Sequence, residues 1–244
     1  MELKQLFPIA ALALLGCQRD QWDDCITSSG SERTEERTIA AFTTIELDDR
    51  IDLVLETRDV GSVSVEAGSN LIGQVVTEVD NGVLKVRNDM RCHWVRSFKP
   101  RVVVHVPVAG IDRVILRGTG NVSCTDTIVR AFFALEQWGA EGDCALLLNV
   151  DVVDIGLHTG AGKATLRGCC ATANLYSGIM APIDASGLDA DVVNVNNSSV
   201  ADFRCRVALK LNVGIHSVGD VYYTGTPPEV YTSITGSGHL YHMD

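Results

Sequence analysis

Aspartates near predicted turns are the residues of this 244-residue chain whose chemistry would matter most. Two carboxylates that flank one bond can act as general acid and base in glycoside hydrolysis. The candidates for such a pair are Asp151, Asp154, Asp184, Asp189 and Asp191. General acid chemistry needs a pKa shifted by burial or by a like charge, and water keeps turn carboxylates ionised. We therefore predict no catalytic residue, with a carbohydrate-active enzyme as the alternative.

A second polar set occupies equivalent positions in similar segments, at Asn121, Asp143 and Asp220. If these segments stack, Asn121 and Asp143 lie on neighbouring repeats and could together form a weak cation site. Lys163 and Pro182 hold the same position in later segments and interrupt an acidic ladder. We favour solvated turns, and we predict that Asp143→Asn and Asp220→Asn leave any binding intact.

The segment Gly160-Ala161-Gly162-Lys163-Ala164-Thr165 superficially resembles a phosphate-binding loop. Such a loop needs glycine at position 157 and Ser or Thr after the lysine, followed by a helix. The chain has Leu157 and Ala164 there, and the residues that follow continue a strand pattern. We exclude nucleotide binding by this segment.

Histidines and aromatic residues offer two further kinds of site. The histidines are His93, His105, His158, His216, His239 and His242. Their spacing matches no zinc motif, so we predict no metal and no cofactor, and expect surface or edge histidines. The aromatic residues Trp94, Trp138, Tyr176, Tyr222 and Tyr223 could be platforms for sugars or peptides, or could pack in the core.

Charge and composition restrict the partners. Apolar residues make up 46% of the chain, enough for a large core, so global disorder is excluded. With 20 Lys and Arg against 31 Asp and Glu, the net charge is −11. A nucleic-acid partner is excluded because phosphate neutralisation needs a basic face, and docking by charge on anionic lipid is disfavoured for the same reason.

The second half of the chain repeats with a period near 20 residues. The repeat is anchored at residues Gly120, Gly142, Gly162, Ala181, Ala201, Gly219 and Gly238, with spacings of 22, 20, 19, 20, 18 and 19. Two residues after each anchor stands an apolar residue, namely Val122, Cys144, Ala164, Ile183, Phe203, Val221 and Leu240. Short strands with this period predict an all-β fold, a β-solenoid or right-handed β-helix-like stack of coils that share one core. A β-sandwich is the alternative.

Within each coil, alternation predicts which side chains point inward. Val122, Ile183, Phe203 and Val221 should face the core. Lys210 and Asn212 should face outward, alternating with Leu209, Leu211 and Val213. Glycine at the corners is expected to supply positive φ where the chain turns sharply.

The first half reads as consecutive short strands that precede the coils. The strands are expected at residues 42–47, 51–57, 62–66, 75–79, 101–106 and 113–116. Asn81-Gly82 lies between two such runs and predicts a hairpin. We place the folded domain at residues 39–244, with the N-terminal strands at 39–116 and the repeat coils at 117–244.

The N-terminus predicts export and a lipid anchor. An apolar run at residues 6–16 is too short to span a bilayer and has the size of a signal-peptide core. Leu14-Leu15-Gly16-Cys17 resembles a bacterial lipobox, which implies a signal peptide at 1–16 and lipidation of Cys17. An ordinary secretory signal is the alternative. Residues 17–38 are polar and charged, and we expect a lipidated, flexible tether there, with membrane attachment through the lipid.

The remaining cysteines are expected to be mostly small core residues. Besides Cys17 they are Cys25, Cys92, Cys124, Cys144, Cys169, Cys170 and Cys205. One or two disulfides are the alternative in an exported protein, with Cys25–Cys92 a bare guess. Of the vicinal pair, one cysteine should point inward and one outward.

Several segments together resemble a known bacterial family, the putative auto-transporter adhesin, head GIN domain. The matching pieces are residues 41–45, 77–86, 115–122, 219–227 (GDVYYTGTP) and 236–238. The resemblance covers residues 40–240 and implies an exported, often lipid-anchored, all-β protein of Bacteroidetes-type bacteria. The chain departs from the family pattern at Ala140, Ile179 and Ala181, where those coils are expected to turn differently.

The combined expectation is a non-enzymatic, lipid-anchored module for adhesion or binding at the outer membrane or cell surface. Its ligand would be a glycan or an envelope or host protein. A carbohydrate-active β-helix enzyme and a periplasmic structural or sensory module that binds another envelope protein are the two alternatives.

Overall fold

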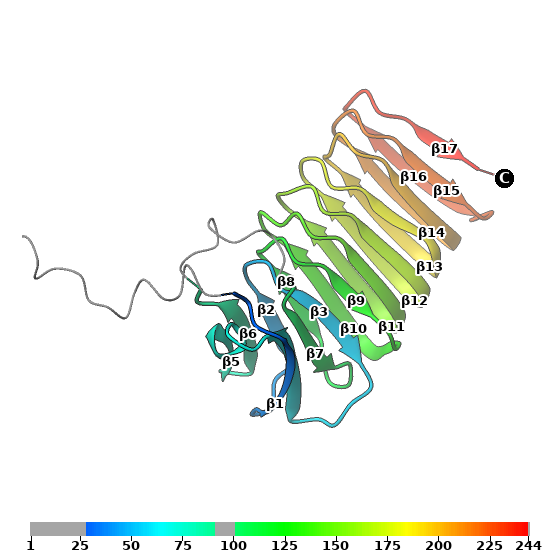
Figure 1. The fold of residues 1–244 in the computed structure, drawn as a ribbon. Coiled ribbons are helices and arrows are strands. Elements are labelled where there is room, and N and C mark those ends of the chain that lie inside the picture. Colours follow the sequence, from blue (N-terminus) through cyan, green and yellow to red (C-terminus); the bar gives the residue numbers. More distant parts are fainter. Residues whose placement is uncertain (1–27, 91–100, 244) are drawn as a thin grey trace, which may run out of the picture.

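The structure is a computed structural model that describes residues 28–90 and 101–243 (Figure 1). Within these ranges the secondary structure is strand throughout, apart from the short 3-10 helix η2 (Ile72–Gln74). No helix in the described part has the length and hydrophobicity needed to cross a bilayer. The signal peptide, the Cys17 anchor, the Cys25–Cys92 pair, His93 and Trp94 all fall outside the described residues.

The described residues fold into 17 strands. They are β1 (Glu32–Thr38), β2 (Thr44–Leu47), β3 (Asp52–Glu56), β4 (Ser62–Gly68), β5 (Val75–Asp80), β6 (Val83–Asn88), β7 (Val103–Pro107), β8 (Arg113–Leu116), β9 (Val122–Cys124), β10 (Ile128–Gln137), β11 (Cys144–Leu157), β12 (Ala164–Ser177), β13 (Ile183–Asn197), β14 (Phe203–Ile215), β15 (Val221–Thr224), β16 (Glu229–Ile234) and β17 (Leu240–His242).

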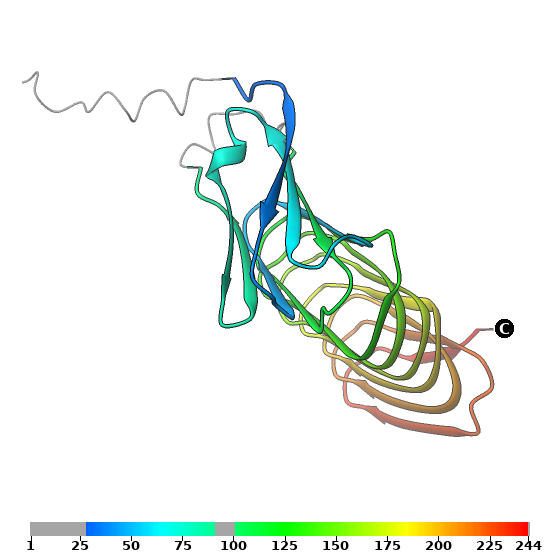
Figure 2. The same cartoon turned by 90° about the horizontal axis from the view of Figure 1, so that it is seen from below.

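The strands from β8 onward wind into a solenoid of parallel coils, which confirms the fold class predicted from the repeat (Figure 1). The long strands β11 to β14 bend in the middle, so each contributes to two faces, as the view along the coils in Figure 2 shows. We call the first face the one formed by β3, β9, the first halves of β11–β14, β15 and β17. The second face is formed by β2, β8, β10, the second halves of β11–β14 and β16.

The predicted coil register is confirmed residue by residue. Val122 pairs with Cys144, and the same row continues through Ala164, Ile183, Phe203, Val221 and Leu240. The four side chains predicted to face the core are buried, and Lys210 and Asn212 do face outward. Leu209 was predicted inward and is 53% exposed, because the register of β14 against β13 shifts at the bend where Leu209 lies.

Glycine occurs at the anchor positions because the backbones of neighbouring coils approach closely there, and not because these residues have positive φ. A Cβ on Gly142 would lie 1.7 Å from the carbonyl oxygen of Gly120 in the neighbouring coil, and one on Gly162 would lie 2.1 Å from that of Gly142. None of these anchors has positive φ. The expectation of left-handed corners is therefore wrong at the anchors, although it holds at Gly160 (φ 111°) and Gly225 (φ 98°) nearby.

The N-terminal strands extend the two faces at one end of the solenoid. On the first face β1 pairs antiparallel with β4, and β4 with β7; on the second face the predicted hairpin joins β5 and β6. Asn81 and Gly82, both with positive φ, make its turn. Because β2 and β3 pair in parallel with β8 and β9, the coil stack runs across the boundary expected at residue 117.

The expected tether at 17–38 is wrong over its last residues, since β1 occupies 32–38. The sequence ERTEERT carries charges at most positions and has no apolar face, which is why it reads as unstructured. In the fold those charges acquire partners. Arg37 donates to the backbone oxygens of Ile72 and Val75, and Glu36 pairs with Arg58.

The described cysteines are free, as expected for small core residues. Cys144, Cys170 and Cys205 are buried and Cys124 is half-buried. Cys169 is exposed where a core position was expected, while Cys170 beside it is buried, so the vicinal pair divides between outside and inside as predicted.

Candidate functional site

A groove of about 670 Å³ runs across the outside of the second face. Its walls and floor come from β8, β10, the second halves of β11–β14, and β16. Seven neighbouring strands spaced ~4.8 Å apart give the groove a length of roughly 30 Å. Two of its lining positions, Gly156 and Gly214, lack side chains, and the imidazole rings of His158 and His216 lie against them.

A ladder of side-chain amides forms the polar floor of this groove. The amide of Asn174 donates to the Asp154 carboxylate at 2.6 Å, Asn194 donates to Asn174 at 2.7 Å, and Asn212 donates to Asn194 at 2.6 Å. These four residues are paired across β11 to β14 in the same register. Each rung is thus held by its neighbour, and the ladder presents one oriented polar group per coil.

Aromatic rings form one margin of the groove. Trp138 stacks on His158 with ring centroids 3.9 Å apart and an interplanar angle of 11°, and His158 contacts Tyr176 at 5.4 Å. Trp138 remains 42% exposed, and its indole nitrogen donates to Glu136 at 3.2 Å. The rings come from successive coils, so they form a continuous apolar strip beside the amide ladder.

The described aromatic residues that the sequence offered as candidate platforms lie on two different faces of the solenoid. Tyr176 lines the groove, and Trp138 lies beside it, in contact with the lining residues His158 and Glu136. The sequence did not distinguish His158 from other surface histidines. Tyr222 and Tyr223 lie on β15 in the first face, where they stack on Tyr241 and His242.

The five candidate aspartates do not converge on one site. Asp154 belongs to the groove, whereas Asp184 pairs with Lys163 at 3.1 Å on the first face. Burial raises the pKa of Asp184, but hydrogen bonds from Ser186 and the contact with Lys163 outweigh it, so that the pKa is lowered. Asp189 pairs with Arg206, and it lines a separate hollow together with Asp191, while Asp151 is exposed.

Two carboxylates do reach the groove, but both are engaged. Glu136 accepts from Arg113 and from Trp138, and Asp154 accepts from Asn174. Among the described residues no group of three or more His, Cys, Asp or Glu side chains has a metal-binding arrangement.

The turn positions Asn121, Asp143 and Asp220 connect neighbouring coils. The Asn121 side-chain oxygen accepts from the backbone N–H of Asp143 at 3.0 Å, and the Asp143 carboxylate accepts from that of Lys163 at 2.9 Å. Asp220 does the same for His239 at 2.8 Å. Neighbouring coils therefore do bring Asn121 and Asp143 together, as predicted, and their oxygens satisfy backbone donors.

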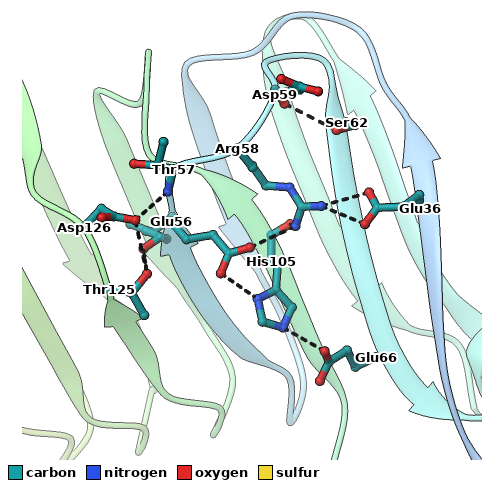
Figure 3. A network of polar contacts seen from close by, with 11 residues as sticks. Glu36, Glu56, Thr57, Arg58, Asp59, Ser62, Glu66, His105, Thr125 and Asp126 are labelled. Atoms are coloured by element: carbon teal, nitrogen blue, oxygen red, sulfur yellow. Dashed lines mark hydrogen bonds and ion pairs between the residues drawn. The ribbon is translucent and has the colours of Figure 1, made fainter.

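A polar network at the N-terminal end joins β1, β3, β4 and β7 (Figure 3). Arg58 donates two 2.8 Å bonds to the Glu36 carboxylate and one to Glu56 at 3.3 Å. His105 lies between Glu56, 3.1 Å from its Nδ1, and Glu66, 3.4 Å from its Nε2. Because the Arg58–Glu36, His105–Glu56 and His105–Glu66 pairs each join different strands or their ends, the network fastens these strands together.

Comparison with known proteins agrees with the fold. The family model of the putative auto-transporter adhesin, head GIN domain, matches residues 41–227. No curated protein matches the chain significantly.

Solved structures of similar architecture come from Bacteroides and Parabacteroides species. A putative adhesin from Bacteroides fragilis superposes with a TM-score of 0.76 at 18% identity, covering 87% of this chain and 97% of that one. A putative lipid binding protein from Parabacteroides distasonis gives 0.68 at 18% identity, with coverages of 88% and 98%. A putative adhesin from Parabacteroides merdae gives 0.59 at 18% identity, with coverages of 88% and 97%. At this identity the likeness establishes the fold.

Proposed function

The chain belongs to the putative auto-transporter adhesin, head GIN domain family, and on that premise we propose that it is a lipid-anchored, non-enzymatic adhesion module of the cell envelope that binds a linear glycan in its outer groove. The observation that carries the proposal is the pairing of a periodic amide ladder with an aromatic strip along one groove.

The spacing of the groove favours a glycan over a peptide. Its polar groups recur once per coil, about every 4.8 Å, whereas an extended peptide rises ~3.3 Å per residue and exposes its side chains on alternate sides. A pyranose unit with its glycosidic oxygen is close in length to one coil step, so successive sugars can meet successive amides. Amides can donate to and accept from hydroxyls, and ring faces pack on aromatic side chains such as Trp138.

The charge of the groove favours a neutral or weakly charged sugar. Arg113 pairs with Glu136, and Lys210, beside the groove, pairs with Glu229 and lies 5.0 Å from the centre of the Tyr231 ring. Arg113 is the one Lys or Arg side chain lining the groove in the described residues, so no free guanidinium or ammonium group is left to select a phosphate or a sulfate.

Binding without hydrolysis is supported by the contacts of the groove carboxylates. A glycosidase keeps one acid protonated and places a second carboxylate across the bond. Glu136 accepts hydrogen bonds from Arg113 and Trp138, so its oxygens are engaged within the protein. Asp154 is likewise committed to the amide of Asn174.

Anchoring is the second part of the proposal. Lipidation of Cys17 would attach the N-terminal end of the solenoid to the outer membrane, and each buried CH₂ of an acyl chain contributes ~0.8 kcal/mol. Incorporation of labelled palmitate into the cellular protein, and its loss in Cys17→Ser together with release from the membrane fraction, tests this part.

The binding part is tested on the soluble Cys17→Ser protein with soluble linear glucans, mannans, chitin oligosaccharides and peptidoglycan strands, by calorimetry. For the best of these probes, Trp138→Ala and Asn194→Leu should each weaken binding by about tenfold, which corresponds to ~1.4 kcal/mol. Phe132→Ala removes an aromatic ring that is 36% exposed on β10 outside the groove, and it should leave binding unchanged.

Absence of binding to every probe, or equal losses in Phe132→Ala and Trp138→Ala, would reject the groove as the site. Time-dependent shortening of a bound glycan would replace this proposal with the carbohydrate-active enzyme.

A further inference from the structure

The hydrogen bonds of the amide ladder all run in one direction. A carboxylate only accepts hydrogen bonds, so Asn174 must turn its Nδ2 toward Asp154 Oδ1, which lies 2.6 Å away. The Oδ1 of Asn174 is then left to accept from Asn194, and the Oδ1 of Asn194 accepts from Asn212. Asp154 therefore fixes the orientation of three amides in three successive coils.

Each amide within the ladder keeps one donor and one acceptor for a ligand. A side-chain amide has two N–H groups and two lone pairs on its oxygen. The ladder uses one of each in Asn174 and in Asn194, and these two side chains make no further hydrogen bond with the described residues. The same donor and acceptor thus recur in the same orientation at each coil step of ~4.8 Å, which suits a polymer that repeats a group offering both.

A second outward row lies beside the ladder, two residues earlier in each strand. In order along the solenoid it consists of Val152, Thr172, Val192 and Lys210, which are paired in register. The two valines are half-buried, and they lie two coils apart, whereas the coil between them and the coil after them carry polar residues in this row. The row therefore offers an apolar contact at every second coil, with a period of about 10 Å.

Resting on the glycan proposal above, we propose that the groove is specific for linear β-1,4-linked sugars that carry N-acetyl groups. An N-acetyl amide offers one N–H and one carbonyl oxygen, which match the free acceptor and donor of a ladder amide. In a β-1,4-linked chain alternate sugars are turned over, so the N-acetyl groups on one side recur at every second sugar. Because two sugars span nearly the length of two coils, the methyl groups on that side would pack on Val152 and Val192.

The surroundings of the groove favour this group over the other common substituents of such sugars. Uronic acids would bring carboxylates toward Asp154 and Glu136 on a chain of net charge −11. An unacetylated amine would bring an ammonium group toward apolar valine side chains and lose hydration there. A hydroxyl group can pair with the ladder amides, but it has no methyl group to cover Val152 and Val192.

Three hexasaccharides with the same β-1,4-linked backbone test the inference by calorimetry on the Cys17→Ser protein. At the second carbon of each sugar they carry a hydroxyl group (cellohexaose), an N-acetyl group (chitohexaose) or a free amine (the chitosan hexamer). Chitohexaose should bind about tenfold more tightly than either of the others, because two of its methyl groups become buried.

Soluble peptidoglycan strands, in which every second sugar also carries a lactyl peptide, distinguish two sources of N-acetylated chains. Tighter binding of these strands than of chitohexaose would support the inference with peptidoglycan as the source. Weaker binding would support it with a chain that has no peptide stems.

An exchange between near-isosteric side chains tests the apolar contacts. Val192→Thr replaces a methyl group by a hydroxyl group and should weaken chitohexaose binding about fourfold, with cellohexaose binding unchanged. Thr172→Val is the matched control, because it makes the reverse change in the neighbouring coil, where no methyl group is expected. It should leave the affinity for chitohexaose unchanged, and both variants should keep the circular-dichroism spectrum of the parent protein.

The outcomes separate this inference from the glycan proposal on which it rests. Equal affinities for chitohexaose and cellohexaose, tightest binding of the chitosan hexamer, or equal effects of Val192→Thr and Thr172→Val would each overturn the N-acetyl specificity and leave the groove as a glycan site. Failure of these probes together with the glucans and mannans would reject the glycan proposal itself.

Discussion

Truncating Phe203 to alanine is expected to destabilise the solenoid by about 3–5 kcal/mol. Phe203 is 0% exposed and pairs with Ile183 in one neighbouring coil and Val221 in the other, both buried. Removing most of an aromatic ring uncovers roughly 100–150 Å² of buried apolar surface, which at ~25 cal/mol per Å² is roughly 3 kcal/mol. The cavity left between two coils adds the remainder, because backbone hydrogen bonds fix the coil spacing and limit collapse.

Urea unfolding followed by circular dichroism measures the change, and hydrogen exchange locates it. Since each coil contacts only its neighbours, the loss should appear first as faster exchange in β14 to β17, with β10 to β12 less affected. Phe132→Ala, at a partly exposed site on β10, is the matched control and should cost under about 1 kcal/mol. A loss below about 1 kcal/mol for Phe203→Ala, or uniform exchange along the chain, would refute both the register and the coil-by-coil stability argument.

The remaining predictions concern the glycines, the turn ladder and the thiols. Gly142→Ala places a Cβ 1.7 Å from a backbone oxygen and should lower stability by more than about 3 kcal/mol in the same urea experiment, whereas Gly73→Ala, with open space around it, should be nearly neutral. Asp143→Ala removes the acceptor of the Lys163 backbone N–H and should lower the free energy of unfolding by about 1 kcal/mol. Asp143→Asn retains an acceptor and should keep most of the stability. Equal losses in the two variants would show that the charge of Asp143, and not its hydrogen bond, stabilises the turn. Maleimide at pH 8.5 should label exposed Cys169 in the native protein and leave Cys144 unlabelled, because burial raises the pKa of the Cys144 thiol to about 12 and keeps it protonated. Mass spectrometry of the labelled peptides measures this. Rapid labelling of Cys144 in the native protein would contradict the prediction.

The amide ladder could have been found in the sequence. Asp154, Asn174, Asn194 and Asn212 are separated by nearly the same intervals as the anchors. In a parallel stack any residue type repeated at the coil period becomes a row, so this spacing was a usable signal. Amides have no acid–base chemistry of their own, so a pattern of catalytic carboxylates does not include these residues.

Strand β1, in contrast, could not have been predicted from its own sequence. Its seven residues carry five charges and have the composition of a flexible tether. These residues form a strand because they pair with the edge of β4, and because Arg37 and Glu36 contact residues that are distant in sequence. A local sequence pattern shows neither of these contacts.

The sequence by itself determined the all-β class, the 20-residue coil and the inward row from Val122 to Leu240. A stack of parallel coils repeats each position in register, so a buried position needs an apolar residue in every coil. The tertiary structure decided where the coils bend and which outward rows meet. It thereby placed Trp138, His158 and Tyr176 beside the amides, and left the edge of β16 open. Those features depend on how far the chain turns at each corner, and the corner geometry is set by backbone contacts between coils that no single segment contains.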